Sequence, residues 1–313
     1  MSAEKHFHSE ASSTDVSTNE YQRLARGNLE KTIKHQVKKL KNSNVPKIAR
    51  KLFKHNITRG RSLVAKAIID AQNESPRFTP VYAALISIIN SKFPQIGQLI
   101  CKRVISSLRN AYMADENEEC FAMTKLLAHL INQRVLNYLV VIQLLHAVLE
   151  NYTDDSIKLA IGLLKECGQH LSKVIPQELV SVFAKLDNLL YEPSLNKHTQ
   201  DMIQVLFTVR RDGFETYPSI QSDLDLIDTN DQYTHMLELL DLCDPEKHLH
   251  DFLYDAEYEA NEDKYKETRK TILGDNDDDK LSSNASSNED QSMITAAKID
   301  TSSSSPSDND KEN

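Results

Sequence analysis

Apolar residues recur at the spacing of an α-helix in one segment after another between residues 26 and 212. In one such segment, Val81, Leu85 and Ile88 fall on a single helical face. The breaks between segments are short, about 2–6 residues, so consecutive helices must lie antiparallel to one another. Glycine is scarce, with only 7 residues, and strand-like alternation is nearly absent, which argues against folds built on β-hairpins. The pattern predicts an all-α fold.

Start and stop signals indicate where the expected helices begin and end. Thr79 followed by Pro80 is typical of a helix N-terminus, and Gly168 is well placed to end a helix. Consecutive helix pairs at about 40-residue spacing describe an α-solenoid of about five antiparallel pairs. The expected helices cover about residues 26–41, 45–55, 58–74, 79–90, 94–110, 117–132, 136–151, 153–168, 175–191 and 197–212.

The chain divides into four parts by composition. Residues 1–22 are polar and rich in serine and threonine, and residues 274–313 combine the run DNDDD with serine-rich stretches. Such segments bury too little apolar area to offset the entropy of ordering, so we expect disordered N- and C-terminal tails. Residues 23–215 are the expected helical domain. Residues 216–273 are an acidic extension, expected to be extended or partly helical and to pack along the last helices of the solenoid or to follow it.

Charge is distributed unevenly along a chain whose net charge is -9. Residues 23–66 contain 14 Lys and Arg against the single acid Glu30, whereas residues 221–263 contain 14 Asp and Glu against the single base Lys247. A basic end of this kind suits nucleic acid or an acidic partner. The alternative is two solvated faces that attract each other weakly or not at all.

No set of residues has the spacing of a catalytic or metal site. The nucleophile-elbow, phosphate-loop and HExxH zinc patterns are absent. His248 and His250 flank Leu249, but no nearby cysteine or carboxylate cluster completes a zinc site. The four cysteines form no CxxC pair and are expected to be buried free thiols. We therefore expect no enzyme activity, no cofactor, no metal and, since no apolar run reaches about 18 residues, no membrane span.

Six segments, in order along the chain, resemble one known family. The resemblance covers about residues 24–272 and identifies the nucampholin family of pre-mRNA-splicing factors, from the complexed-with-Cef group. The segments are RGRSLVAKAIIDAQ (Arg59–Gln72), FTPVYAALISIINSKFPQIGQLICKR (Phe78–Arg103), LLAHLINQ (Leu126–Gln133), TDDSIKLAIGLLKECG (Thr153–Gly168), MIQVLFTVRRDGF (Met202–Phe214) and DLDLIDTNDQYTHML (Asp223–Leu237).

The resemblance implies a HEAT-like fold of the type found in the middle domain of initiation factor four-G. It also implies a nuclear, non-catalytic splicing scaffold that binds the DEAD-box RNA helicase of the exon junction complex. The family's middle domain keeps the two lobes of that helicase apart and brings it to spliceosomal proteins. The family normally continues into an MA3-type domain and an Arg/Ser-rich tail, whereas this sequence continues into an acidic tail. We therefore expect helicase binding and leave full splicing competence open.

The resemblance also places the helicase contacts at the front helices and at the loop Asn90, Ser91, Lys92, Phe93. Asn90 and Lys92 are the expected polar contacts, although Asn90 capping a helix and Lys92 being solvated is an alternative. Arg59 and Arg61 are further bases for an acidic partner or for RNA, which the basic N-terminal helices also suit.

Two other functions remain open at this point. One is a translation-initiation type of scaffold for a cytoplasmic DEAD-box helicase, against which the stretches NSKFPQIG and TDDS favour the splicing branch. The other is a basic-faced RNA-binding solenoid without a helicase partner.

Overall fold

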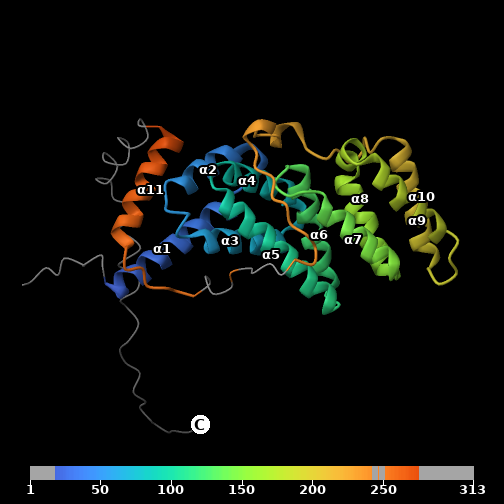
Figure 1. The fold of residues 1–313 in the computed structure, drawn as a ribbon, viewed down its shortest axis with the longest axis horizontal. Helices are drawn as coiled ribbons and strands as arrows, with labels where there is room; N and C mark the ends of the chain where they lie inside the picture. Colours follow the sequence, from blue (N-terminus) through green and yellow to red (C-terminus); the bar gives the residue numbers. More distant parts are fainter. Residues whose placement is uncertain (1–17, 242–245, 247–250, 275–313) are drawn as a thin grey trace, which may run out of the picture. The chain divides into compact units, whose positions relative to one another are not determined.

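The computed structural model describes residues 18–241, 246 and 251–274, and within these ranges the chain is built of helices. The expected all-α, HEAT-like solenoid of antiparallel helices is confirmed (Figure 1). The α-helices are α1 (Asn19–Lys38), α2 (Val45–Phe53), α3 (Arg61–Glu74), α4 (Thr79–Lys92), α5 (Pro94–Met113), α6 (Asn117–Asn132), α7 (Leu139–Glu150), α8 (Asp154–Val174), α9 (Pro176–Leu189), α10 (Lys197–Arg211) and α11 (Tyr258–Leu273).

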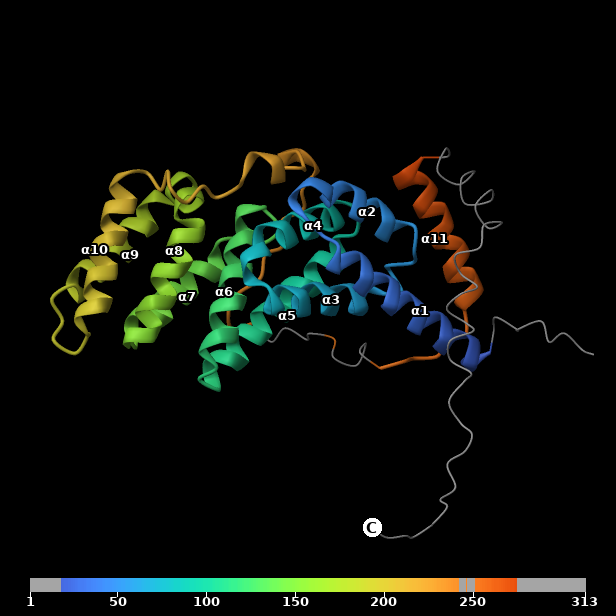
Figure 2. The same ribbon diagram turned by 180° about the vertical axis from the view of Figure 1, so that it is seen from behind.

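Each of the helices α1–α10 contacts a neighbour in the chain and also a helix two positions away. α4 packs on α5, α5 on α6 and α7 on α8, while α1 touches α3, α2 touches α4 and α8 touches α10. Figures 1 and 2 show the resulting stack from both sides. The apolar stripe of each helix is thereby removed from water, and Ile68, Leu85 and Ile100 are fully buried.

Local signals set most helix ends as expected. Thr153 caps α8, since its Oγ1 accepts a hydrogen bond from the Ser156 amide at 3.1 Å, and the Ser156 hydroxyl oxygen accepts one from the Thr153 amide at 2.8 Å. Asp154 and Asp155 follow in the first turn, where carboxylates suit the helix dipole. α10 ends at Arg211, followed by Gly213 with a φ of +65°, a conformation that glycine adopts without strain.

The N-terminal boundary differs from the expected one. Residues 19–22 are helical, because α1 begins at Asn19 with Thr18 as its cap rather than near residue 26. The Gln22 side chain is buried and exchanges two hydrogen bonds with the backbone of Asp255, at 2.8 and 2.9 Å. The seven residues before the expected start, about two turns, are thus held by a partner far along the chain. The remaining expected tails, before residue 18 and after residue 274, lie outside the described residues, as do His248 and His250.

Gly168 does not end α8, which continues to Val174. A Cβ atom at this position would lie 2.4 Å from Cε1 of Phe214, so the glycine makes room for an aromatic ring. Phe214 follows α10 with a φ of +58° and is buried. The expected helix stop is therefore wrong, and Gly168 is a packing residue inside the helix.

The segment that follows α10, residues 216–241, runs back across the helices instead of staying with the last ones; we call it the return segment (Figures 1 and 2). The Gln133 side chain donates to the Leu224 carbonyl at 3.0 Å. Further along the segment, the His235 amide donates to the Val135 carbonyl at 2.9 Å, and the Asn137 amide donates to the His235 carbonyl at 3.0 Å. These bonds form an isolated parallel bridge between otherwise helical parts.

α11 lies against the front helices, next to α1 and α2 in Figure 1. The Tyr265 hydroxyl donates to the Phe53 carbonyl at 3.1 Å, and the ring of Tyr258 meets that of Tyr21 edge-on, with centroids 6.0 Å apart. The acidic extension thus packs on the basic front of the chain. No helix in the described ranges is long and apolar enough to cross a lipid bilayer.

Candidate functional site

The loop between α4 and α5 is held rigidly by its aromatic residue. Phe93 caps α4 through its amide, which donates to the Ile89 carbonyl at 2.7 Å, and the next residue, Pro94, opens α5. The Phe93 ring is buried between Phe53 and Tyr265, with centroid distances of 5.7 and 6.1 Å. Phe93 therefore fixes the loop from within and presents little surface to a partner.

Asn90 points into the protein, in contrast to the expected role as a surface contact. Its side chain is fully buried, and its Nδ2 donates to Gln232 Oε1 at 2.8 Å and to the Tyr233 carbonyl at 2.6 Å. Its Oδ1 accepts from His235 Nε2 at 2.7 Å. Since every polar atom of the amide is used, Asn90 attaches the return segment to α4 and is not available to a partner.

Acidification is expected to weaken this attachment. Burial and the positive charge of Lys102 lower the pKa of His235 from 6.5 to about 4, although a hydrogen bond with the Pro94 backbone opposes the shift. Because the folded pKa lies below the unfolded one, the stabilisation is present above pH 6.5 and is lost as the pH falls toward 4. We expect the free energy of unfolding to fall by about 2 kcal/mol between about pH 8 and pH 5 from this group alone.

Urea unfolding of the unmodified chain and of His235→Gln at both pH values isolates that contribution. The difference between the two pH profiles belongs to His235, because all other titrating groups are shared. Parallel profiles would contradict the prediction.

Ser91 and Lys92 differ in what they offer a partner. The Ser91 hydroxyl donates to the Ile88 carbonyl at 3.0 Å, within its own helix. Lys92 is exposed at the end of α4. Of the four loop residues, Lys92 is therefore the one whose charged group is presented at the surface.

Arg59 and Arg61 are paired with acidic residues of the extension. Arg59 Nε lies 2.8 Å from Glu262 Oε1, with its guanidinium 4.8 Å from the centroid of the Tyr258 ring. Arg61 Nε lies 3.2 Å from Glu246 Oε2. The basic front and the acidic extension therefore meet each other directly, and these two arginines reach a further partner only alongside, or in place of, those carboxylates.

A cavity of about 640 Å³ brings four of the expected site residues together; we call it the α11 groove. Arg59, Arg61, Lys92 and Phe93 line it, whereas Asn90 and Ser91 do not. The opposite wall comes from the extension and includes Leu253, Lys264 and Tyr265. Five basic side chains line the groove against Asp251 and Asp255, so its cationic rim and its aromatic side chains suit an acidic partner segment that carries an apolar residue.

The residues of the extension were missed as site residues. Their stretch is strongly acidic, and it was expected to be extended or only partly helical. A detectable signal was present, since Tyr258, Tyr265 and Ile272 follow one another at a spacing of seven, and both tyrosines are buried. That spacing predicts one helical face that packs on another surface.

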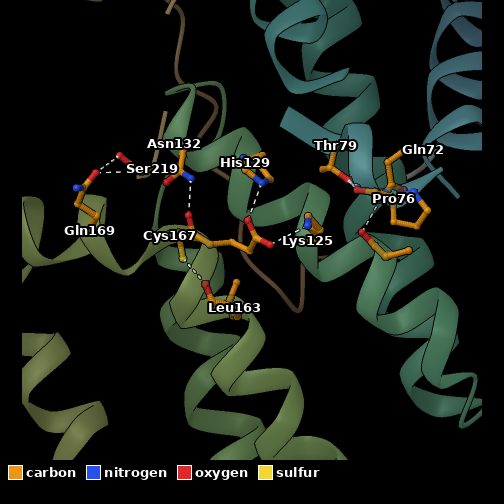
Figure 3. A network of polar contacts seen from close by, with 12 residues as sticks. Gln72, Pro76, Thr79, Lys125, His129, Asn132, Leu163, Cys167, Gln169 and Ser219 are labelled. Carbon is orange, nitrogen blue, oxygen red and sulfur yellow. Dashed lines mark hydrogen bonds and ion pairs between the residues drawn. The ribbon is translucent and has the colours of Figure 1, made fainter. Parts of the chain in front are cut away.

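A second polar cluster joins α6 to α8. Figure 3 shows Lys125, His129 and Asn132 of α6 turned toward α8. Lys125 Nζ and His129 Nε2 lie 2.8 and 2.9 Å from the two carboxylate oxygens of Glu166, and Asn132 Nδ2 donates to its carbonyl at 2.8 Å. Burial alone would raise the pKa of Glu166, but His129 and Lys125 outweigh it and lower the pKa to about 2. The carboxylate is thus ionised and internally paired.

The cysteines in the described ranges have the properties of core residues. Cys101, Cys120 and Cys167 are buried free thiols. Burial raises the pKa of Cys101 to about 12 and that of Cys120 to about 11, so neither is a reactive thiolate at neutral pH. The same ranges contain no group of three or more His, Cys, Asp or Glu side chains able to hold a metal ion.

The helical stack corresponds to a known domain, because residues 30–213 match the MIF4G domain. The chain belongs to the MIF4G-domain family. This MIF4G chain is 45% identical over 266 residues to the mouse (Mus musculus) pre-mRNA-splicing factor CWC22 homolog, which covers 85% of this chain and 29% of the mouse protein. The human (Homo sapiens) pre-mRNA-splicing factor CWC22 homolog is 44% identical over 266 residues, which are again 85% of this chain and 29% of the human protein.

A further relative of the MIF4G chain has a name of another kind. The housefly (Musca domestica) male determiner protein Mdmd(Y) is 43% identical over 265 residues, which cover 85% of this chain and 23% of that protein. The MIF4G chain therefore spans less than a third of the length of each of these three relatives. The expected resemblance to the complexed-with-Cef splicing-factor family is confirmed.

Proposed function

We propose that this MIF4G chain is a nuclear, non-catalytic pre-mRNA-splicing scaffold. It binds the DEAD-box helicase of the exon junction complex, holds it in an open, inactive state and brings it to the spliceosome. The observation that carries the proposal is the 266-residue similarity to proteins named as pre-mRNA-splicing factors, together with the MIF4G match over residues 30–213, which includes the α4–α5 loop. Buried thiols of raised pKa and internally paired acidic and basic groups support a scaffold rather than an enzyme.

The physical requirement of this function is differential affinity. A scaffold that bound the open and closed helicase equally would shift nothing, so it must contact a surface that exists only when the two lobes are apart. The rigid α4–α5 loop and the cationic rim of the α11 groove support this proposal, because they offer a fixed surface on which Lys92 and Lys264 are exposed cations. Electrostatic complementarity of this kind gives orientation and specificity.

Reversing the charge of Lys92 tests the site. We expect Lys92→Glu to lower the recovery of the helicase from nuclear extract by about fivefold or more, since a like charge replaces a complementary one. Lys47→Glu is the matched control, because Lys47 is exposed on α2 and does not line the α11 groove. Both variants should unfold within about 0.5 kcal/mol of the unmodified chain, as surface substitutions do.

Affinity purification of the tagged chain, read by mass spectrometry, gives the recovery. Equal helicase recovery with Lys92→Glu and Lys47→Glu would reject Lys92 as a contact. Absence of both the helicase and spliceosomal proteins from the unmodified chain would reject the function itself.

A second assay separates the scaffold from a plain RNA-binding protein. Purified chain added to the purified helicase should lower its RNA-stimulated ATP hydrolysis, and Lys92→Glu should restore it. Direct RNA binding with a steep dependence on salt, and without any effect on the helicase, would favour the RNA-binding alternative. The pairing of Arg59 with Glu262 and of Arg61 with Glu246 argues against that alternative, because it neutralises two cations of the basic front.

A further inference from the structure

A second cavity, of about 250 Å³, lies between α6, α8 and the start of the return segment; we call it the α6–α8 pocket. It shares no lining residue with the α11 groove. Its walls include Arg77 from the short turn before α4, Lys125 and His129 from α6, Lys165 from α8, and Tyr217 from the return segment. The α6–α8 pocket is thus a separate feature, built from four parts of the chain.

Positive charge is in excess in this pocket. Arg77, Lys125 and Lys165 line it against the single carboxylate of Glu166. Both oxygens of that carboxylate are already bonded, one to Lys125 and one to His129. The Arg77 guanidinium lies 4.7 Å from the Phe78 ring centroid and the Lys165 ammonium 5.6 Å from that of Tyr217, and neither forms an ion pair with a residue in the described ranges. Two cations therefore face the cavity without an anion.

The wall formed by the return segment is fixed. The amide and the hydroxyl of Ser219 donate to Gln169 Oε1 at 3.0 and 3.1 Å, a contact drawn in Figure 3. On the other side, the buried Gln133 side chain donates to the Leu224 carbonyl. These bonds hold the return segment in place at both ends of the pocket, so the wall that faces the exposed Arg77 and the half-buried Lys165 is preformed.

The neighbouring surface selects the kind of anion. A shallow cavity of about 850 Å³ shares Lys125 with the pocket and is lined by Glu116, Glu118 and Glu119. A nucleic-acid backbone, with a phosphate at every residue, would place further negative charges beside these carboxylates. A peptide that carries one anionic side chain avoids that repulsion and is also small enough for the pocket.

We propose that the α6–α8 pocket binds an oxyanion, a phosphate or carboxylate group, on a side chain of a partner protein. Arg77 and Lys165 supply the charge-assisted hydrogen bonds, while Lys125 and His129 keep Glu166 turned away from the incoming group. This site is independent of the helicase, and its test uses the purified chain alone, so its failure and that of the proposed function are distinguishable.

The test is fluorescence anisotropy of the purified full chain at low salt with labelled short peptides of alanine and glycine around one central residue. The central residue is phosphoserine, aspartate or serine. We expect the phosphoserine peptide to bind at least about fivefold more tightly than the serine peptide, as one well-placed ion pair gives. The aspartate peptide distinguishes the two oxyanions. If it binds as tightly as the phosphoserine peptide, a carboxylate is sufficient. If it binds more weakly than the phosphoserine peptide, the pocket selects a phosphate.

The double substitution Arg77→Ala and Lys165→Ala should abolish the preference for the anionic peptides. Lys173→Ala is the matched control, because Lys173 is exposed on the same helix, α8, and does not line the pocket. The thermal unfolding midpoint of each variant verifies folding. The proposal would be overturned if the serine and phosphoserine peptides bound with equal affinity. It would also be overturned if the double variant kept the preference for the anionic peptides. Tighter binding of labelled oligouridylate through the same two residues would overturn it in favour of RNA.

Discussion

Replacing Asn90 with alanine is expected to lower the free energy of unfolding by about 3–4 kcal/mol, because the substitution leaves several buried polar groups without partners. The substitution removes Asn90 Oδ1, which accepts from His235 Nε2. It also removes Asn90 Nδ2, which donates to Gln232 Oε1 and to the Tyr233 carbonyl. Asn90 and His235 are buried, so water cannot replace these bonds without reorganising the return segment. The largest change should be a local detachment of residues 232–237.

Two measurements together check this result. Urea unfolding gives the change in free energy, and hydrogen exchange of the His235 and Asn137 amides reports on the bridge that the return segment makes beyond α6. Asn110→Ala on α5 is the matched control, since Asn110 is exposed and should cost less than about 0.5 kcal/mol. Unchanged exchange at His235 would show that Asn90 is not what attaches the segment.

This prediction also separates two reasons for a loss of partner binding. Lys92→Glu is expected to weaken binding without a change in stability, because Lys92 is exposed. Asn90→Ala is expected to weaken binding only to the extent that it releases the return segment. If the Asn90→Ala variant were as stable as the unmodified chain but no longer bound the partner, Asn90 would be a direct contact.

Gly168→Ala, which adds one methyl group, is also expected to have a large effect. It should lower the free energy of unfolding by about 2–4 kcal/mol. In an exposed helix, glycine to alanine stabilises by about 1 kcal/mol. Here the new Cβ would lie 2.4 Å from Cε1 and 2.6 Å from Cζ of the Phe214 ring, well inside contact distance. The ring is buried and is held by a backbone with a φ of +58°, so it has little room to withdraw.

The same helix supplies the control. Gly162 also lies in α8, but no atom stands within 4 Å of the position of its Cβ. Gly162→Ala should therefore stabilise the chain by about 0.5–1 kcal/mol. A smaller residue in place of the ring, Phe214→Leu, should reduce the cost of Gly168→Ala, and the double-mutant cycle measures that coupling. Additive effects would mean that the glycine and the ring do not interact.

The basic and acidic stretches illustrate what a sequence can and cannot specify. Their opposite charges were evident, and both an external partner and two separate solvated faces were open possibilities. The structure pairs Arg59 with Glu262 and Arg61 with Glu246, at separations of 203 and 185 residues. Charge patterning gives the sign of an attraction but not its partner, because Coulomb forces carry no information about which loop returns to which surface.

The local features of this protein follow from patterns of neighbouring residues. Apolar periodicity, the Thr153 cap and the prolines at helix starts predicted an all-α chain and most of its helix ends, but not the start of α1 or the end of α8, since these signals act within one or two turns. Three other features are properties of the folded chain: Gly168 is a packing site, Asn90 faces inward and α11 closes on the front helices. Each of these depends on a contact between residues far apart in the chain, and the residue types alone are equally compatible with a helix stop, a surface contact and an unattached tail.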